Sequence, residues 1–265
     1  MSENIILKYL TAVSNALGEN MKDFVVIGGM ANYIYHLVKG SDSSLTTFDI
    51  DLLTEVNRKR TFNLDEKLEP LGFSTVIGKN QEVKFRNIEW RKSTDVYFEI
   101  EILVPLKGKE TSGRKVYAAK NVVGQPLRYT DILLKNPKRF KLRNGPKIMI
   151  PHPGRYILQK TLSYKKRDSR EELHKDIAYI VDVLNLYFIE TDDLIGEILN
   201  VSKGVPASWI ISAMSNFKEL FIERDQYDGI RISEKFLPDL TFDQIKIQTG
   251  MFIEKLIKCL EKNKN

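Results

Sequence analysis

The 265-residue sequence predicts an α/β fold, in which a small mixed sheet with flanking helices is followed by a helical bundle domain. Short apolar runs with strand-like alternation are confined to the first part of the chain. After the sequence IPHPG (150–154), apolar residues instead recur at helical spacings of three and four, and the two prolines are typical of a helix entry. We therefore expect two domains, residues 1–150 and 151–265.

The elements of the first domain follow from local patterns. Apolar residues at spacings of three and four predict a helix over residues 3–20, which ends near Gly18. The predicted strands are residues 24–27, 47–54, 73–77, 83–88 and 96–104, with short additions at 115–118 and 147–150; helices are predicted at 30–38 and within 63–73. Alternating helices and strands favour an α/β arrangement.

The second domain is predicted to be entirely helical. The expected helices begin near Gly154 and continue over residues 170–189, 191–200, 206–224 and 241–261. Their apolar stripes are typical of the core of a bundle.

Two aspartates, Asp49 and Asp51, stand one residue apart in the sequence TTFDIDLLTE. Residues i and i+2 of a strand point to the same face, so both carboxylates project together, while Phe48, Ile50 and Leu52 face the core. Mg²⁺ prefers hard oxygen ligands and binds through one or two carboxylates together with substrate phosphates. The pattern therefore indicates a metal and nucleotide site.

A glycine pair, Gly28 and Gly29, follows the apolar run FVVI and opens a helical stretch. A helix start offers free backbone N–H groups, and glycine has no Cβ to obstruct a phosphate. This pair is a candidate for contact with the β- and γ-phosphates of a nucleoside triphosphate.

A third acidic segment, DVYFEIEILVP (95–105), alternates apolar residues with carboxylates that include Glu99 and Glu101. Carboxylates on the polar faces of two neighbouring strands repel one another when no cation is present. The segment therefore strengthens the case for a metal site over that of two merely solvated strand faces.

These motifs, in this order, resemble the nucleotidyltransferase superfamily of polymerase-β-like fold. IGG (27–29), TFDID (47–51) and the strand containing EIEIL (99–103) match its pattern. Within it, the chain looks most like the AbiEii-like branch of abortive-infection and toxin–antitoxin proteins, which carry T/S-x-D-h-D and a later K-x6-R. Lys160 and Arg167 have that spacing, followed by Lys175-Asp176.

The resemblance implies a nucleotidyltransferase-like fold and assigns roles to residues. Asp49, Asp51 and a third carboxylate would be catalytic and hold two Mg²⁺ ions, while an NTP is the substrate. Glu101 is preferred over Glu99 as the third carboxylate, because two apolar residues follow it. The nucleotide would be bound by Gly28, Gly29, Thr47, Lys160 and Arg167. The chain departs from the family in having Gly-Gly in place of Gly-Ser, and Glu in place of the third Asp.

Charge is distributed unevenly. Residues Lys107–Lys147 contain twelve Lys and Arg against two acids, a net +10, so the rest of the chain carries −4 of the overall +6. A block of this kind is either a solvated loop or an electrostatic footprint for phosphates. Tyr117, Tyr129 and Phe140 are interleaved and could stack on bases. With the resemblance, this segment favours RNA, or tRNA, as the acceptor, and a cognate antitoxin as a partner.

The amino-acid composition excludes several other classes of protein. A single cysteine, Cys259, excludes an internal disulfide framework or a cysteine-rich zinc site. The three histidines, His36, His152 and His174, are interpreted as surface or capping residues. No apolar run reaches the length of a membrane span, and no signal-peptide pattern is visible, so a cytoplasmic protein without membrane contact is expected.

Two other functions stay open at this stage. A small-molecule nucleotidyltransferase of the antibiotic-modifying type would act on an aminoglycoside-like hydroxyl, although a cationic acceptor fits the +10 segment poorly. A catalytically inactive nucleotide-binding module is the second alternative, because of the glutamate at the third acidic position.

Overall fold

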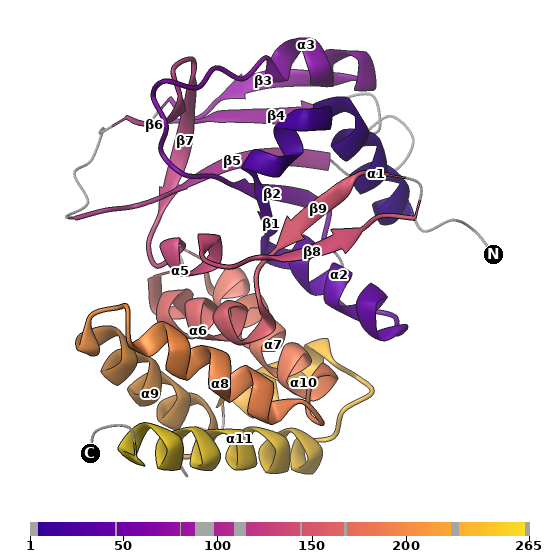
Figure 1. The fold of residues 1–265 in the computed structure, drawn as a ribbon. Coiled ribbons are helices and arrows are strands. Elements are labelled where there is room, and N and C mark those ends of the chain that lie inside the picture. Colours follow the sequence, from indigo (N-terminus) through magenta and orange to yellow (C-terminus); the bar gives the residue numbers. More distant parts are fainter. Residues whose placement is uncertain are drawn as a thin grey trace. The chain divides into compact units, whose positions relative to one another are not determined.

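The computed structural model describes residues 5–45, 47–79, 81–87, 98–108, 115–143, 145–166, 169–223 and 228–262 (Figure 1). The chain divides into two compact units. The first comprises Met1–Ala31 and Thr46–Pro151, and the second Asn32–Leu45 and His152–Asn265. The division near residue 150 thus lies where the sequence changes character, but Asn32–Leu45, which we assigned to the first domain, groups with the helical unit.

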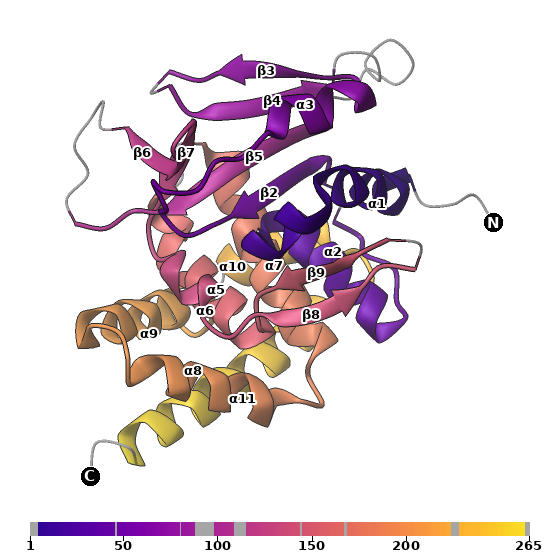
Figure 2. The same cartoon turned by 45° about the horizontal axis from the view of Figure 1, so that its top comes forward.

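A mixed sheet organises the first unit. Its strands are β1 (Val25–Ile27), β2 (Asp49–Leu53), β3 (Phe73–Ile77), β4 (Val83–Asn87), β5 (Phe98–Pro105), β6 (Val116–Ala119), β7 (Val122–Leu127), β8 (Lys138–Lys141) and β9 (Lys147–Ile150). The main order is β3-β4-β5-β2-β1-β9-β8, and β7 pairs with β5 and β6; Figure 1 labels all nine strands and Figure 2 gives a second view of the sheet. Pairs β2–β5, β1–β9 and β5–β7 are parallel and the others antiparallel. The predicted α/β class with a mixed sheet is therefore confirmed.

Short helices accompany this sheet. They are α1 (Ile5–Leu17), the start of α2 (Gly28–Lys39), α3 (Leu64–Leu68) and α5 (Asp131–Leu134). Tyr9 of α1 packs its ring against Phe98 of β5 and Phe73 of β3, with centroids 3.8 and 5.5 Å apart. Helix α1 thereby covers part of the sheet, as its amphipathic sequence predicts.

The two faces of β2 have different surroundings. Ile50 and Leu52 are fully buried, whereas Asp49 is exposed and Asp51 half-buried. Leu53, on the same face as the aspartates, belongs to an apolar cluster that also contains Val25, Ile27, Leu103 and Leu133. The carboxylates therefore lie at the end of a buried apolar layer that fixes the backbone beneath them.

Strands β7 and β8 and helices α5 and α10 (Asp228–Phe236) were not predicted. Strand β7 contains Gly124 and Pro126, which are depleted in strands, and β8 has the sequence KRFK, without the apolar alternation of a half-buried strand. Both are held by pairing with distant neighbours, and a local pattern cannot reveal that.

The second unit is helical, as predicted. Besides the end of α2, its helices are α6 (Pro153–Ser163), α7 (Arg170–Leu186), α8 (Thr191–Ser202), α9 (Ala207–Phe221), α10 and α11 (Phe242–Lys262). His152 caps α6 by accepting a hydrogen bond from the Gly154 N–H at 3.2 Å, and Ser169 caps α7 in the same way. Among the helices in the described ranges, none is both long enough and apolar enough to cross a membrane.

Candidate functional site

The acidic residues of β2 and β5 are aligned side by side. The two strands are parallel, with Asp49 opposite Glu99 and Asp51 opposite Glu101. Paired residues of neighbouring strands point to the same face, so the carboxylates form one acidic face of the sheet. Each glutamate has an aspartate neighbour, and Glu101 is the neighbour of the less exposed one, Asp51.

Gly28 lies directly against Asp51. Strand β1 ends at Ile27, opposite Asp51, and α2 begins at the next residue. Gly28 has φ +64°, and a Cβ placed on it would lie 1.8 Å from Asp51 Oδ2. Only glycine combines this left-handed backbone with the close approach of a carboxylate. The positive end of the α2 dipole favours a negative charge at this place.

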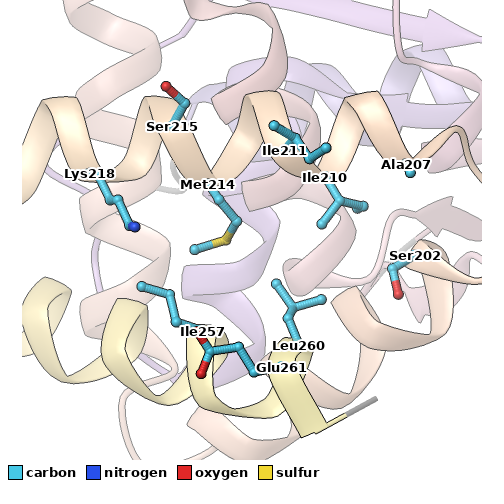
Figure 3. A pocket seen from close by; sticks show the side chains of 10 residues that line it. All are labelled: Ser202, Ala207, Ile210, Ile211, Met214, Ser215, Lys218, Ile257, Leu260 and Glu261. Atoms are coloured by element: carbon cyan, nitrogen blue, oxygen red, sulfur yellow. The ribbon is translucent and has the colours of Figure 1, made fainter. Parts of the chain in front are cut away.

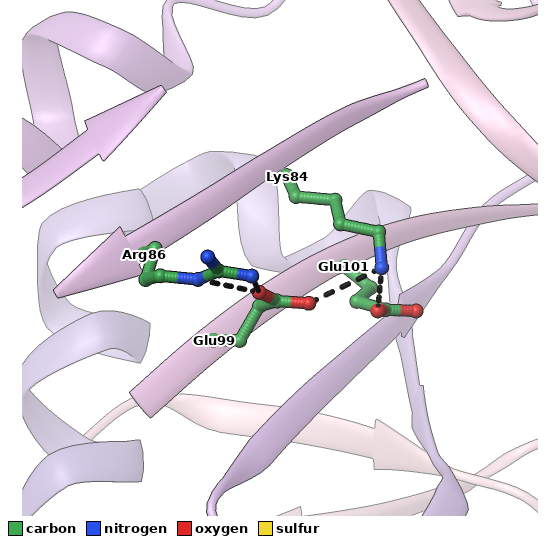
Figure 4. Close-up of polar contacts among 4 residues, drawn as sticks. All are labelled: Lys84, Arg86, Glu99 and Glu101. Carbon is green, nitrogen blue, oxygen red and sulfur yellow. Dashed lines mark hydrogen bonds and ion pairs between the residues drawn. The ribbon is translucent and has the colours of Figure 1, made fainter. Parts of the chain in front are cut away.

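Two basic residues of β4 contact the glutamates from the other side of β5. Lys84 is opposite Glu101 and Arg86 opposite Glu99. The Lys84 ammonium donates to Glu101 and, at 3.2 Å, to Glu99 Oε1, while Arg86 Nε and Nη2 donate to Glu99 Oε2 at 2.9 and 2.6 Å (Figure 4). The glutamates are therefore held by cations within the sheet.

The pKa values of Glu99, Glu101 and Lys84 are shifted by burial and by their charged neighbours. Burial and the charge of Asp51 raise the pKa of Glu101 to about 7. Burial also raises the pKa of Glu99, but hydrogen bonds with Glu101, Arg86 and Lys84 lower it overall. Burial lowers the pKa of Lys84, whereas its bonds to Glu101 and Glu99 raise it on balance. The least stabilised charge is thus on Glu101.

The cation that these carboxylates were expected to require is supplied in part by the sheet itself, although the charge of Asp51 still raises the pKa of Glu101. Lys84 and Arg86 partly neutralise them, and the sequence analysis missed both. The signal was present in VKFRN (83–87), where Lys and Arg alternate on one face just as Glu99 and Glu101 alternate in EIE. Recognising it required the knowledge that β4 and β5 pair.

The donor set of the acidic face suits a divalent cation. Asp49 and Asp51 supply hard oxygen ligands, and the Lys84 ammonium stands in for a cation beside Glu101. Across the described ranges, no group of three or more His, Cys, Asp or Glu side chains is placed so that it could hold a metal ion, and Glu101 is hydrogen bonded to Lys84. The residues present therefore fit a metal ion, but Glu101 would have to leave Lys84 to complete its coordination.

The other predicted residues of the first unit flank this face. The Asp49 N–H donates to Thr47 Oγ1 at 3.4 Å, and this contact helps to fix the chain at the start of β2. Gly29 is buried in the first turn of α2. Thr47, Gly28 and Gly29 therefore all lie within a few residues of the aspartates or of the strand paired with them.

Lys160 belongs to the second unit and is buried there. Its ammonium pairs with Asp176 of α7 and lies 5.6 and 5.2 Å from the ring centroids of Tyr156 and Tyr179. Arg167, its predicted companion, lies outside the described residues. The structure thus shows Lys160 in a buried ion pair and leaves its predicted contact with a triphosphate untested.

Helix α7 carries a second buried aspartate, Asp182. Asn32 Nδ2 donates to it at 2.7 Å, and His36 Nε2 lies 2.8 Å from the same carboxylate oxygen. The interpretation of His36 as a surface or capping residue is therefore wrong: it is buried and hydrogen bonded. The capping interpretation of His152 is confirmed.

Two cavities lie in the helical unit. One, of about 670 Å³, is bounded mainly by apolar side chains of α9 and α11 (Figure 3): Ile210, Ile211, Met214, Ile257 and Leu260, together with Lys218 and Glu261. A polar cavity of about 380 Å³ is lined by Arg170, Arg231, Lys235, His174 and Asp228, among others. Burial, Arg170 and Lys235 lower the pKa of His174, as expected in basic surroundings. The apolar cavity does not suit a triphosphate, whereas the polar one could accept an anionic group.

The described part of the basic segment contains the strands β6, β7 and β8 and the helix α5, so it is not a single solvated loop. Its strand β8 lies at the edge of the sheet and exposes Lys138, Arg139 and Lys141, with Phe140 half-buried between them. Charged side chains on an edge strand also prevent unwanted strand pairing. The exposure is thus compatible with a phosphate-binding surface and with a purely protective role.

The sequence of this chain matches a known protein family. A family model described as nucleotidyltransferase matches residues 10–196. Among solved structures, an antigenic nucleotidyltransferase-like protein from Paracoccidioides brasiliensis is similar, with 16% identity, a TM-score of 0.38, and coverage of 79% of this chain and 94% of that one. No curated protein matches. The family match spans the acidic face, Gly28 and Gly29, and helices α6 and α7.

Proposed function

Because the chain belongs to a nucleotidyltransferase family, we propose that it transfers a nucleoside monophosphate from an NTP to an acceptor hydroxyl in a Mg²⁺-dependent reaction. The observation that carries this proposal is the register of β2 and β5, which aligns Asp51 with Glu101, while Gly28 leaves room for Asp51 at the start of α2. A solvated strand face has no need of such a close approach between a glycine and a carboxylate.

Asp49 and Asp51 would hold the metal ions, and Glu101 would complete the site once released from Lys84. Bound Mg²⁺ supplies charge stabilisation for the attacking and leaving oxygens of an in-line displacement at the α-phosphorus. Two ions are consistent with the number of carboxylates on this face.

The chain's own groups have distinct tasks in this reaction. Backbone N–H groups at the start of α2, near Gly28 and Gly29, would bind the β- and γ-phosphates. The acceptor oxygen forms a bond to the α-phosphorus, the bond from that phosphorus to the bridging oxygen breaks, and pyrophosphate leaves. A carboxylate oxygen of Glu101 would take the proton of the acceptor hydroxyl.

We propose RNA as the acceptor, with tRNA as the form that the AbiEii-like resemblance favours. The exposed cations of β8 and the basic residues of the polar cavity, Arg170, Arg231 and Lys235, support a phosphate-rich partner. A role as a toxin restrained by a cognate antitoxin extends the same resemblance.

The test is incubation of the purified full chain with each labelled NTP, Mg²⁺ and total RNA. We expect label in RNA with the wild type, and loss of at least a thousandfold in rate for Asp51→Asn, because a carboxylate that holds the metal is replaced. Asp239→Asn, an exposed carboxylate of the second unit, is the matched control and should keep full activity.

The other outcomes separate the alternatives. Folding is checked by thermal melting, in which Asp51→Asn should be as stable as the wild type or slightly more stable. Label on a small cationic hydroxyl compound, and none on RNA, would favour the small-molecule transferase. NTP binding without transfer to any acceptor would favour the inactive nucleotide-binding module, and full activity of Asp51→Asn would contradict the site.

A further inference from the structure

Lys84 bridges the two glutamates of the acidic face. Its ammonium contacts Glu101 and Glu99 at once, from the strand on the side of β5 away from the aspartates (Figure 4). Glu101 lies between Asp51 on β2 and Lys84 on β4. The Lys84 ammonium therefore contacts the residue that the proposed function assigns as the third metal ligand.

The bridge is partly open to solvent. The side chains of Lys84 and Glu101 are 23% and 20% exposed. A lysine ammonium is a compact point charge on a flexible four-carbon stem, so it can move away without a rearrangement of the strand that carries it. These are the properties of a contact that another cation can replace.

We propose that Lys84 is the internal counter-ion of the acidic face and competes with the metal ion for Glu101. The proposal rests on the proposed function. In the metal-free protein, Lys84 holds Glu101 and limits its repulsion with Asp51. When a divalent cation binds the aspartates, Glu101 exchanges Lys84 for the metal. Lys84 is thus a positioning residue, which sets how tightly metal binds and where Glu101 points before it does.

Arg86 provides the matched comparison. It lies on the same strand two residues further on, faces the same way, and pairs with Glu99 through two hydrogen bonds. Both of these hydrogen bonds go to Glu99 Oε2, whereas the ammonium of Lys84 is the donor to Glu101. Loss of Arg86 therefore removes one positive charge from the acidic face but leaves the Lys84–Glu101 contact in place.

The experiment measures Mn²⁺ binding to the full chain without nucleotide, by calorimetry and by the electron paramagnetic resonance of free Mn²⁺. We expect Lys84→Met to bind Mn²⁺ about tenfold more tightly than the wild type, because the competing charge is gone. Arg86→Met should change the affinity about twofold or less, since Arg86 is hydrogen bonded to Glu99, which is not among the proposed metal ligands. In EDTA, Lys84→Met should have a lower melting temperature than the wild type. Added Mn²⁺ should raise the melting temperature of Lys84→Met by more than it raises that of the wild type.

The outcomes distinguish failure of the metal site from failure of the competition between Lys84 and the metal. If neither the wild type nor any variant binds Mn²⁺, the metal site of the proposed function is wrong. If the wild type binds it, Asp51→Asn abolishes the binding, and Lys84→Met binds with equal or lower affinity, the competition is overturned while the proposed function stands. Equal tightening by Arg86→Met would also overturn it, in favour of a general charge effect.

A second variant keeps the test decisive if Lys84→Met fails to fold, as judged by circular dichroism. Lys84→Gln retains a hydrogen-bond donor for the glutamates but carries no charge. It should reproduce the tighter Mn²⁺ binding, and an affinity equal to that of the wild type would count against the proposal.

Discussion

Lys84 with Glu101 and Lys160 with Asp176 are ion pairs of the same chemistry in different surroundings. The first is about one-fifth exposed on both sides, whereas Lys160 and Asp176 are only 6% and 3% exposed and lie beside two tyrosine rings. Breaking a partly solvated ion pair costs little free energy, because water solvates the two separated charges. A buried pair, once formed, is strongly destabilised by loss of either partner. The Lys84–Glu101 pair therefore adds little to stability and can exchange its partner, whereas the Lys160–Asp176 pair is part of the core of the helical unit.

Loss of Lys160 should have the largest effect on stability. Lys160→Met removes the ammonium that pairs with the buried carboxylate of Asp176, so we expect the free energy of unfolding to fall by about 3–5 kcal/mol in urea denaturation. The double variant Lys160→Met/Asp176→Leu should recover most of the loss. Lys255→Met, which breaks the exposed pair with Asp192, should change stability by about 1 kcal/mol or less.

Equal losses in Lys160→Met and Lys255→Met would remove the contrast on which the comparison rests. Retained NTP affinity in a folded Lys160 variant would, in addition, contradict the direct triphosphate contact that the sequence predicted for this residue.

Gly28→Ala should have the next largest effect. Alanine at φ +64° is strained by about 1–2 kcal/mol, and its Cβ would displace the Asp51 carboxylate. We therefore expect a lower melting temperature and a large loss of nucleotidyl transfer. Gly40→Ala, with a similar φ of +67° but nothing within 4 Å of its Cβ, is the control: it should lose similar stability but keep activity. Equal activity in both variants would show that the place of Asp51 beside Gly28 is unimportant.

The pH dependence of stability should show the smallest effect. The pKa of Glu101 in the folded protein, about 7, is raised from the ordinary value of 4.5, so its ionisation opposes folding at pH 8; this penalty shrinks as the pH falls through 7 and is gone below 4.5. Relative to Glu101→Gln, the wild type should gain on the order of 1 kcal/mol between pH 8 and pH 5.5, measured by urea denaturation.

Glu99→Gln tests the sign of that effect. The pKa of Glu99 is lowered, so its contribution is present at neutral pH and is lost only as the pH falls below the ordinary carboxyl range. Identical pH profiles for the wild type and Glu101→Gln between pH 8 and 5.5 would mean that Lys84 already compensates Glu101 fully.

The sequence predicted the strand β2 and the common face of its aspartates because both follow from a period of two. It also predicted the glycine turn, since a strand, two glycines and a helical pattern are consecutive. Lys84 escaped prediction because its role depends on the register between β4 and β5, which is set by pairing in space. In the same way, the partner of Lys160 is sixteen positions away on another helix, and only the packing of α6 on α7 identifies it.

The position of β8 at the edge of the sheet has a consequence for handling the protein. An edge strand can pair with a strand of another copy, and exposed charges on it, here Lys138, Arg139 and Lys141, generally discourage such self-association. Removal of these charges to study RNA binding would therefore also lower solubility. Light scattering at the working concentration is needed beside any such measurement, so that precipitation is not mistaken for a change in affinity.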